Sequence, residues 1–416
     1  MDYFKYKNSS LYCEGVSVKK IAKKYDTPLF IYSQKTILEH FSKLKEAFSQ
    51  IKPLICYSVK ANSNLSILKL LVKAGAGLDI VSGGELYRAK KIKCHSEKIV
   101  YASVGKTEEE IKEAIAEDIF MFNVESTNEL KRIDKIAKKS GKKVRVSLRL
   151  NPDVESKTHK YITTGKKETK FGIDKKSARE IFLGADKYKN VIIAGIHLHI
   201  GSQITESFPF ISALKKTKEF LAAIPASKNL EFLNIGGGLG IVYKDEQPQT
   251  AKEFAKNTLP LLKTIGLKVI LEPGRFIIGN AGILVTKVLY NKESYNKGFI
   301  VVDAAMNDFL RPSLYNAYHK IITVDENKNK LFQKNKLVDI VGPVCESGDF
   351  LGKKRKISAD EGDYLAVFGA GAYGTSMSSN YNSRRRAPEV LINNKRCYRI
   401  KKRESYQDLI KQEIII

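Results

Sequence analysis

The strongest constraint on the fold of this 416-residue chain is a repeating rhythm that begins near residue 54. A short apolar, β-branched run ends in Gly, Ser, Asn or Lys, and a stretch rich in Lys, Glu and Leu with helical spacing follows it. This alternation is typical of βα units that build a parallel sheet. The eight strand candidates are LICYSVK (to Lys60), GLDIVS (to Ser82), KIVYAS (to Ser103), IFMFNVE (to Glu125), VRVSLRL (to Leu150), IAGIHLHI (to Ile200), FLNIGGG (to Gly238) and KVILEPG (to Gly274).

Eight such units favour a closed (β/α)8 barrel of the TIM type over the alternative, an open doubly wound sheet. Barrel enzymes carry their chemistry at the carboxyl ends of the strands and often bind phosphate in the last two loops. The unusual residues of this chain stand at those strand ends: Lys60, His199, the glycines at 236–238, and Glu272. The sequence therefore predicts an α/β fold with a site at one mouth of a barrel.

The pattern changes after about residue 276. Segments such as GILVTKVLY, GFIVVDAAM, KLVDIVGPV and DYLAVFGAG are β-rich and separated by polar turns. We expect a barrel over residues 31–276 and a second, mostly β domain, like a β-sandwich or barrel, formed by residues 1–30 and 277–416. The run LFIYS, before a helix at 34–48, is expected to add a strand to this second domain.

Composition excludes several classes of protein. The formal net charge is +27, but the lysines are spread over almost every helix-like segment rather than clustered, which indicates a solvated surface and no nucleic-acid function. Five cysteines without CxxC spacing argue against a zinc site and against a disulfide framework. The apolar runs are shorter than a membrane span and the first ten residues lack a signal-peptide core, so we expect a cytoplasmic protein without membrane contact.

The candidate chemistry begins with Lys60, because a lysine amine can condense with an aldehyde cofactor. In a chain with so many lysines, the residues that accompany it carry the inference. Glycines at 236–238 expose backbone N–H groups that suit a phosphate. Glu272 can pair with a pyridinium nitrogen, and Arg275 can bind a phosphate or a substrate carboxylate. An ordinary structural ion pair is the alternative for Glu272.

The segment HLHIGS places two histidines two residues apart on one strand, so they share a face. Such a pair can bind zinc, but no third ligand accompanies it at a suitable spacing, and we expect no metal. His199 is better suited to stack on a flat ring, with Ser202 near the phosphate. His197 is as compatible with a core position as with a functional one.

Two segments of the second domain are poor packing sequences and are therefore candidates for function. In GPVCESGD, a thiol at Cys345 stands beside a carboxylate at Glu346, which suits proton delivery. In GAGAYG, small residues frame Tyr373, which suits contact with a ligand.

With these motifs in order, the sequence resembles the diaminopimelate decarboxylases, members of the alanine-racemase-like (fold-type III) class of pyridoxal-phosphate enzymes. The similarity extends over nearly the whole chain. The motifs that carry it include YSVKANSN, GLDIVSGGEL, HLHIGSQ, NIGGGLG, EPGR, DAAMNDFLRPSLYNAYH, GPVCESGD and GAYGTSMSSNYNSR.

The resemblance implies a Schiff base between Lys60 and pyridoxal 5'-phosphate, and a head-to-tail homodimer with shared active sites in which Cys345 donates a proton. It further implies two sets of binding residues. Those for the cofactor are His199, Ser202, Gly236, Gly237, Gly238, Glu272, Gly274, Arg275 and Tyr373. Those for the substrate are Arg275, Arg311, Tyr315, Glu346 and Tyr373.

The implied reaction is decarboxylation of meso-2,6-diaminopimelate to L-lysine, the last step of lysine biosynthesis. Relatives that act on ornithine, arginine or carboxynorspermidine share the cofactor machinery, and an amino-acid racemase is a further alternative. A distal amino-carboxylate end needs a cation and an anion, which Arg275 or Arg311 beside Glu346 supply. This favours diaminopimelate. A cofactor-carrier protein of the single-barrel type would lack the second domain.

Overall fold

The computed structural model describes residues 3–154, 170–224, 229–330 and 337–416. Contacts divide the chain into two compact units. The barrel unit comprises residues 40–241 and 247–276, and the β unit comprises residues 1–39, 242–246 and 277–416. The boundary between the two units thus falls after Glu39, whereas the sequence pattern predicts it after residue 30. The β unit also includes the short segment 242–246.

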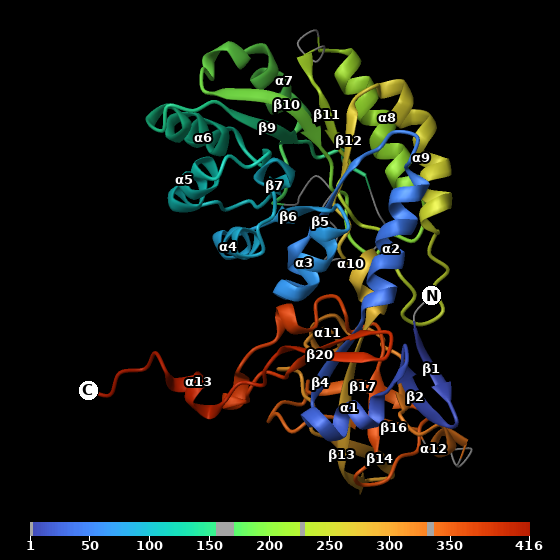
Figure 1. The fold of residues 1–416 in the computed structure, drawn as a ribbon. Coiled ribbons are helices and arrows are strands. Elements are labelled where there is room, and N and C mark those ends of the chain that lie inside the picture. The colour runs from blue at the N-terminus through green and yellow to red at the C-terminus, as the bar shows by residue number, and fades with distance from the viewer. Residues whose placement is uncertain (1–2, 155–169, 225–228, 331–336) are drawn as a thin grey trace. The chain divides into compact units, whose positions relative to one another are not determined.

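In the barrel unit, all eight expected strands form one closed parallel barrel in the order β10-β11-β12-β5-β6-β7-β8-β9 (Figure 1). The (β/α)8 prediction is therefore confirmed, and the doubly wound alternative is wrong. A buried apolar cluster formed by the barrel strands includes Cys56, Val100, Met121, Ala194 and Ile270. The strands are β5 (Leu54–Ser58), β6 (Gly77–Ile80), β7 (Ile99–Tyr101), β8 (Met121–Val124), β9 (Val144–Arg149), β10 (Val191–His197), β11 (Phe232–Asn234) and β12 (Lys268–Leu271).

Helices surround these strands, and polar caps fix where several of them begin. Asn64, Ser82 and Thr107 each accept a backbone N–H from the first turn of α3, α4 and α5. In α6, Leu130, Ile133, Ile136 and Ala137 form the buried stripe, while its lysines face outward. The helices are α2 (Gln34–Ala47), α3 (Leu65–Lys73), α4 (Gly83–Lys91), α5 (Glu108–Ala116), α6 (Thr127–Lys139), α7 (Lys175–Leu183), α8 (Phe208–Ala222) and α9 (Ala251–Ile265).

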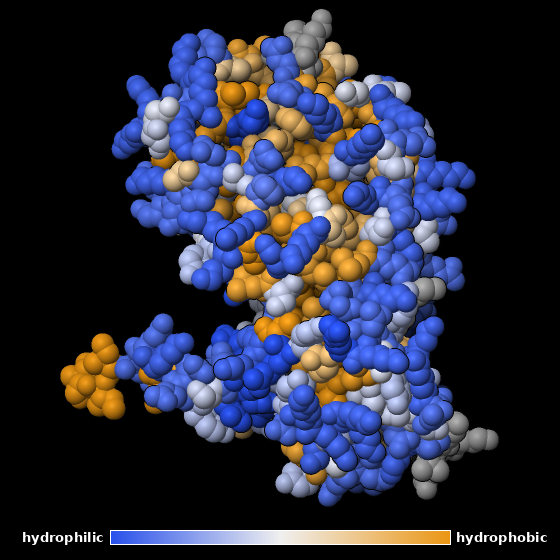
Figure 2. Space-filling view, viewed as in Figure 1, coloured by the Kyte–Doolittle hydropathy of each residue, from blue (hydrophilic) through white to orange (hydrophobic). Residues whose placement is uncertain are grey.

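The surface agrees with the spread of charge in the sequence. On the face that Figure 2 shows, hydrophilic side chains cover the edges of the barrel unit, and hydrophobic side chains are visible between them. Over the described residues, no helix has the length and apolar character needed to cross a membrane.

The β unit is built on strand β13 (Gly282–Ser294), which pairs with β4, β14 and β18. Strand β4 (Leu29–Ser33) lies between β13 and β19 (Glu389–Asn393), antiparallel to the first and parallel to the second. The expected contribution of LFIYS to this sheet is thus confirmed. The other elements are β1 (Phe4–Lys7), β2 (Ser10–Cys13), β3 (Val16–Ser17), α1 (Val18–Tyr25), β14 (Lys297–Val302), α11 (Arg311–Tyr315), β15 (Ile321–Thr323), α12 (Glu326–Lys330), β16 (Val338–Val341), β17 (Phe350–Arg355), β18 (Tyr364–Val367), β20 (Arg396–Lys401) and α13 (Tyr406–Ile410).

Candidate active site

The barrel unit carries the first group of candidate residues, each directly after a strand. Lys60 lies in a short 3-10 turn, Val59–Ala61, that follows β5. His199 and Ser202 follow β10, the glycines at 236–238 follow β11, and Glu272, Gly274 and Arg275 follow β12. Because the strands of the barrel are parallel, their carboxyl ends lie at the same mouth.

Lys60 contacts a carboxylate that the sequence reasoning missed. Its Nζ donates to Asp79 Oδ2 at 3.1 Å, and the Ser58 hydroxyl donates to the same oxygen at 2.7 Å. Asp79 is fully buried in β6. Burial and the neighbouring Glu272 raise the pKa of Asp79, while Lys60 opposes this rise. The sequence does contain a signal for Asp79: a carboxylate inside the apolar run GLDIVS is expected to be buried, and a buried charge requires a partner.

The carboxylate of Glu272 is only 4% exposed and has three polar neighbours. Its Oε1 accepts hydrogen bonds from Asn123 Nδ2 at 2.8 Å and Asn234 Nδ2 at 2.6 Å, and its Oε2 lies 3.2 Å from His197 Nε2. Burial alone raises the pKa of Glu272, but His197, Lys60 and Asn234 outweigh it, so its pKa lies below the usual value. The carboxylate is therefore ionised at neutral pH, and His197 is one of its neighbours.

His199 is held as a neutral imidazole. Burial lowers its pKa well below the usual value, and the cations of Arg149 and Lys60 lower it further. The Gly237 N–H lies 3.3 Å from His199 Nδ1 and donates to it, which leaves the proton on the other ring nitrogen. A neutral, flat ring of this kind is suited to stacking.

The glycines at 236–238 have no space for side chains. A Cβ on Gly237 would lie 2.2 Å from the Glu272 carbonyl oxygen, and one on Gly236 would lie 2.4 Å from the Leu198 carbonyl oxygen. Gly236 and Gly238 also have φ values of 68° and 105°, which favour glycine. The ends of β10, β11 and β12 can approach one another only because these positions lack side chains.

Arg275 and Ser202 provide a second polar feature at the same end of the barrel. Arg275 is 6% exposed, and its Nη2 donates to the Ser202 hydroxyl at 3.0 Å. A buried guanidinium beside a hydroxyl is suited to an anion. With the amine of Lys60 and the ionised Glu272, the set fits a phosphorylated pyridine aldehyde: an imine-forming amine, a counter-ion for a ring nitrogen, and donors for a phosphate.

The second group of candidate residues belongs to the β unit. Arg311 and Tyr315 are the first and last residues of α11, and Arg311 is buried, with Nη1 donating to the Tyr243 hydroxyl at 2.8 Å. Cys345 and Glu346 lie in the loop between β16 and β17, both exposed in the single chain. Tyr373 follows β18, with a φ of 58°.

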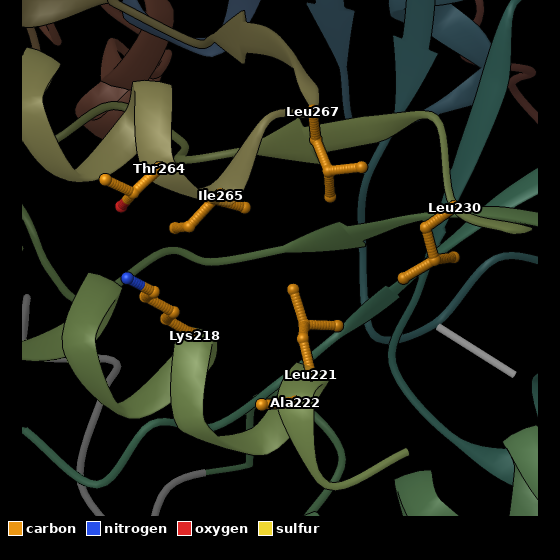
Figure 3. A pocket seen from close by; sticks show the side chains of 7 residues that line it. All are labelled: Lys218, Leu221, Ala222, Leu230, Thr264, Ile265 and Leu267. Carbon is orange, nitrogen blue, oxygen red and sulfur yellow. The ribbon is translucent and has the colours of Figure 1, made fainter. Parts of the chain in front are cut away.

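A cavity of about 360 Å³ lies at the opposite end of the barrel strands (Figure 3). Leu230 and Leu267, which line it, precede β11 and β12, so the cavity is beside the amino ends of these strands. Leu221 and Ile265 make its other walls apolar. Barrel chemistry is found at the carboxyl ends, so we do not assign the active site to this cavity.

Glu85 offers a test of the electrostatics near Lys60. Burial raises its pKa to about 7, although the Val81 N–H, which donates to Glu85 Oε2 at 2.8 Å, and Lys60 lower it. Between its usual value of 4.5 and about 7, the folded protein retains a proton that the unfolded chain releases. Ionisation of Glu85 therefore costs stability as the pH rises through this window. We expect Glu85→Gln, which cannot ionise, to gain stability relative to the wild type between pH 5 and pH 8.

The measurement is urea unfolding of both proteins at the two pH values. Glu109→Gln, at an exposed carboxylate in the first turn of α5, is the matched control and should not change the pH dependence. Equal pH dependence of Glu85→Gln and the wild type would contradict the raised pKa.

The fold and the site together define a pyridoxal-phosphate barrel of the decarboxylase class. A family model described as "Pyridoxal-dependent decarboxylase, pyridoxal binding domain" matches residues 34–279. The relatives are more specific. The diaminopimelate decarboxylase of Aquifex aeolicus is 48% identical, over 100% of this chain and 98% of its own, and that of Haemophilus influenzae is 45% identical, over 98% of both.

A solved structure gives the same result. The diaminopimelate decarboxylase of M. jannaschii in complex with L-lysine matches with a TM-score of 0.93 and 38% identity, covering 100% of this chain and 98% of the other. The chain belongs to the diaminopimelate decarboxylase family. The cofactor predicted from the sequence, pyridoxal 5'-phosphate, is confirmed by this membership.

Proposed function

We propose that this protein removes one carboxylate from meso-2,6-diaminopimelate and releases L-lysine and CO2. The relatives that match over the full chain bear the name of this enzyme, and one solved relative binds L-lysine. Two features at the carboxyl ends of the barrel strands carry the proposal: the amine of Lys60, which donates to the buried Asp79, and the buried, ionised carboxylate of Glu272.

Pyridoxal phosphate, when bound, accepts the electrons that a departing carboxylate leaves behind. The residues of the barrel unit prepare for this chemistry. Lys60 supplies the amine that holds the aldehyde, with Asp79 beside it to accept a proton or return one. Glu272 would supply the negative charge that a ring nitrogen needs as counter-ion, and Asn123 and Asn234 fix the orientation of its carboxylate. Gly274 and the glycines at 236–238 would border the phosphate, with Arg275 and Ser202 as donors.

Substrate selection is assigned to the β unit, together with Arg275. A distal amino-carboxylate group needs an anion for its ammonium and a cation for its carboxylate, and Glu346 with Arg311 supplies both. Tyr315 and Tyr373 are proposed as further contacts. A substrate such as ornithine, which lacks the distal carboxylate, would leave a buried guanidinium facing its ammonium group.

We assign the completion of the site to a head-to-tail homodimer, in which Cys345 and Glu346 of one chain serve the cofactor held by Lys60 of the partner subunit. Both residues are exposed in the single chain, as a contribution to a partner would require. Cys345 would protonate the carbon that has lost CO2. The proposed location of the enzyme is the cytoplasm.

The direct test is incubation of the purified protein and pyridoxal phosphate with a panel of meso-diaminopimelate, ornithine and arginine. Release of CO2 and lysine from the first substrate alone is the expected result. Exchange of the Cα hydrogen without gas release would instead indicate a racemase, and CO2 from ornithine or arginine would indicate a different decarboxylase.

Cys345→Ala tests the proton donor. We expect kcat to fall about a hundredfold, the lower end of what a positioned acid contributes. Absorption by the bound cofactor should persist, because Cys345 belongs to the β unit. Steady-state kinetics and a visible spectrum of the same preparation provide the measurement. Cys397→Ala, at a partly buried thiol on β20, is the control; unchanged turnover in Cys345→Ala would refute the assignment.

A further inference from the structure

In the β unit, Cys345 and Glu346 each form a hydrogen bond with one of two consecutive residues, Asn382 and Tyr381. The Tyr381 hydroxyl donates to Glu346 Oε1 at 2.5 Å. Next to it, the Cys345 N–H donates to Asn382 Oδ1 at 3.4 Å. The segment 381–382 therefore contacts both Cys345, the proposed proton donor, and Glu346, which is proposed to bind the substrate.

The segment that carries Tyr381 and Asn382 is itself anchored to the interior of the β unit. Arg384 donates from Nη2 to the Asp303 carbonyl oxygen at 2.5 Å and from Nε to Asn307 Oδ1 at 3.0 Å. Asn382 has a φ of 53°, a left-handed conformation that asparagine tolerates better than most residues. Tyr381 therefore projects from a fixed support, although its own side chain is 45% exposed.

The base of the Cys345–Glu346 loop is anchored separately. The buried carboxylate of Asp349 accepts the Met306 N–H at 2.7 Å and the Val344 N–H at 2.8 Å. The Ser313 hydroxyl donates to the Gly348 carbonyl oxygen at 2.6 Å, which ties the loop to the helix that carries Arg311. These bonds hold the two ends of the loop. Among the residues that the structure describes, Tyr381 is the one that forms a hydrogen bond with the side chain of Glu346.

We infer that Tyr381 is a positioning residue that holds the Glu346 carboxylate ready for the distal ammonium group of the substrate, and so sets the preference for substrates with a distal amine. This inference rests on the proposed function. A free glutamate side chain loses rotamer freedom when it binds a ligand, and a hydrogen bond made beforehand reduces that loss. The raised pKa of the Tyr381 hydroxyl, caused by its bond to Glu346, keeps the phenol protonated and able to donate.

The test compares two substrates that differ only in the distal amine, meso-diaminopimelate and 2-aminopimelate. In Tyr381→Phe, we expect KM for meso-diaminopimelate to rise about tenfold, as loss of one hydrogen bond to a charged group predicts. We expect kcat to stay within about twofold, because Cys345 keeps its contact with Asn382. The preference for meso-diaminopimelate, as a ratio of kcat/KM values, should then fall about tenfold.

Tyr398→Phe is the matched control, because Tyr398 lies in the same unit and is 44% exposed. Tyr398→Phe should change neither kcat nor KM. An equal loss of kcat/KM on both substrates in Tyr381→Phe would show a merely structural role and overturn the inference. An unchanged preference would overturn it as well. A wild-type protein that releases no CO2 from meso-diaminopimelate would instead overturn the proposed function itself, and this inference with it.

A double-mutant cycle with Glu346→Gln separates a direct contact of Tyr381 with the substrate from action through Glu346. If Tyr381 acts through Glu346, Tyr381→Phe should lower the preference little further in the Glu346→Gln protein. A full additional tenfold loss would show that the two side chains act independently and would overturn the positioning role.

Discussion

Lys60→Ala is expected to lower kcat by about a thousandfold or more, the largest loss among the substitutions considered, because it removes the amine that we propose holds the cofactor. The same change leaves the carboxylate of Asp79 without its 3.1 Å partner in a fully buried position. Kinetics at saturating pyridoxal phosphate measure the first effect. The visible spectrum before and after borohydride, with peptide mapping, shows whether the cofactor still becomes fixed to the chain.

Lys73→Ala is the control for this experiment, since Lys73 ends the helix that follows Lys60 and is exposed. It should keep wild-type turnover and the same borohydride product at residue 60. Near-normal activity in Lys60→Ala, or a cofactor fixed to another lysine, would refute the assigned role of Lys60.

Glu272→Gln is expected to reduce kcat about a hundredfold to a thousandfold, the size of effect seen when one fixed electrostatic group is removed from an active site. The substitution can preserve the shape of the site. The amide oxygen of glutamine can accept from Asn123 and Asn234 as Oε1 does, while its NH2 group faces His197. The lost charge would then account for the loss of activity, because Glu272 is the proposed ionised partner of the ring nitrogen.

Glu231→Gln provides a control on the same unit, at an exposed carboxylate 3.7 Å from Lys268. Melting temperatures and cofactor absorption of both variants should resemble those of the wild type, so that a fall in kcat reflects chemistry. If Glu272→Gln retained full turnover, the charge of Glu272 would have no part in the reaction.

Much of the barrel was predictable because its strands are short, apolar and followed by polar residues. Each strand candidate, from LICYSVK to KVILEPG, overlaps a strand of the closed sheet, although IAGIHLHI begins two residues after the start of β10. The mostly β character of the rest was also predictable from runs such as GILVTKVLY. The domain boundary was harder to predict from the sequence. It falls within α2, between residues 39 and 40, and the sequence of this continuous helix does not mark it.

The site was predictable where a reactive residue type followed a strand, as for Lys60, Glu272 and the glycines. Their assigned roles remain predictions. The polar contacts that tune them were not predictable, because they join residues far apart in the chain: Asn123 reaches Glu272 across 149 positions. The contact of Tyr381 with Glu346 spans 35 positions and depends on the backbone turn at Asn382, which composition alone does not specify.

The place of strand β4 has a consequence for how the chain folds as it is made. All five residues of β4 are buried between β13 and β19, yet β13 begins about 250 residues later and β19 about 360 residues later. At a synthesis rate of about 5–20 residues per second, the ribosome needs roughly 12–50 s to deliver even the first partner. Throughout this interval the nascent chain carries an aggregation-prone apolar segment with unpaired backbone groups. Chaperones shield segments of this kind.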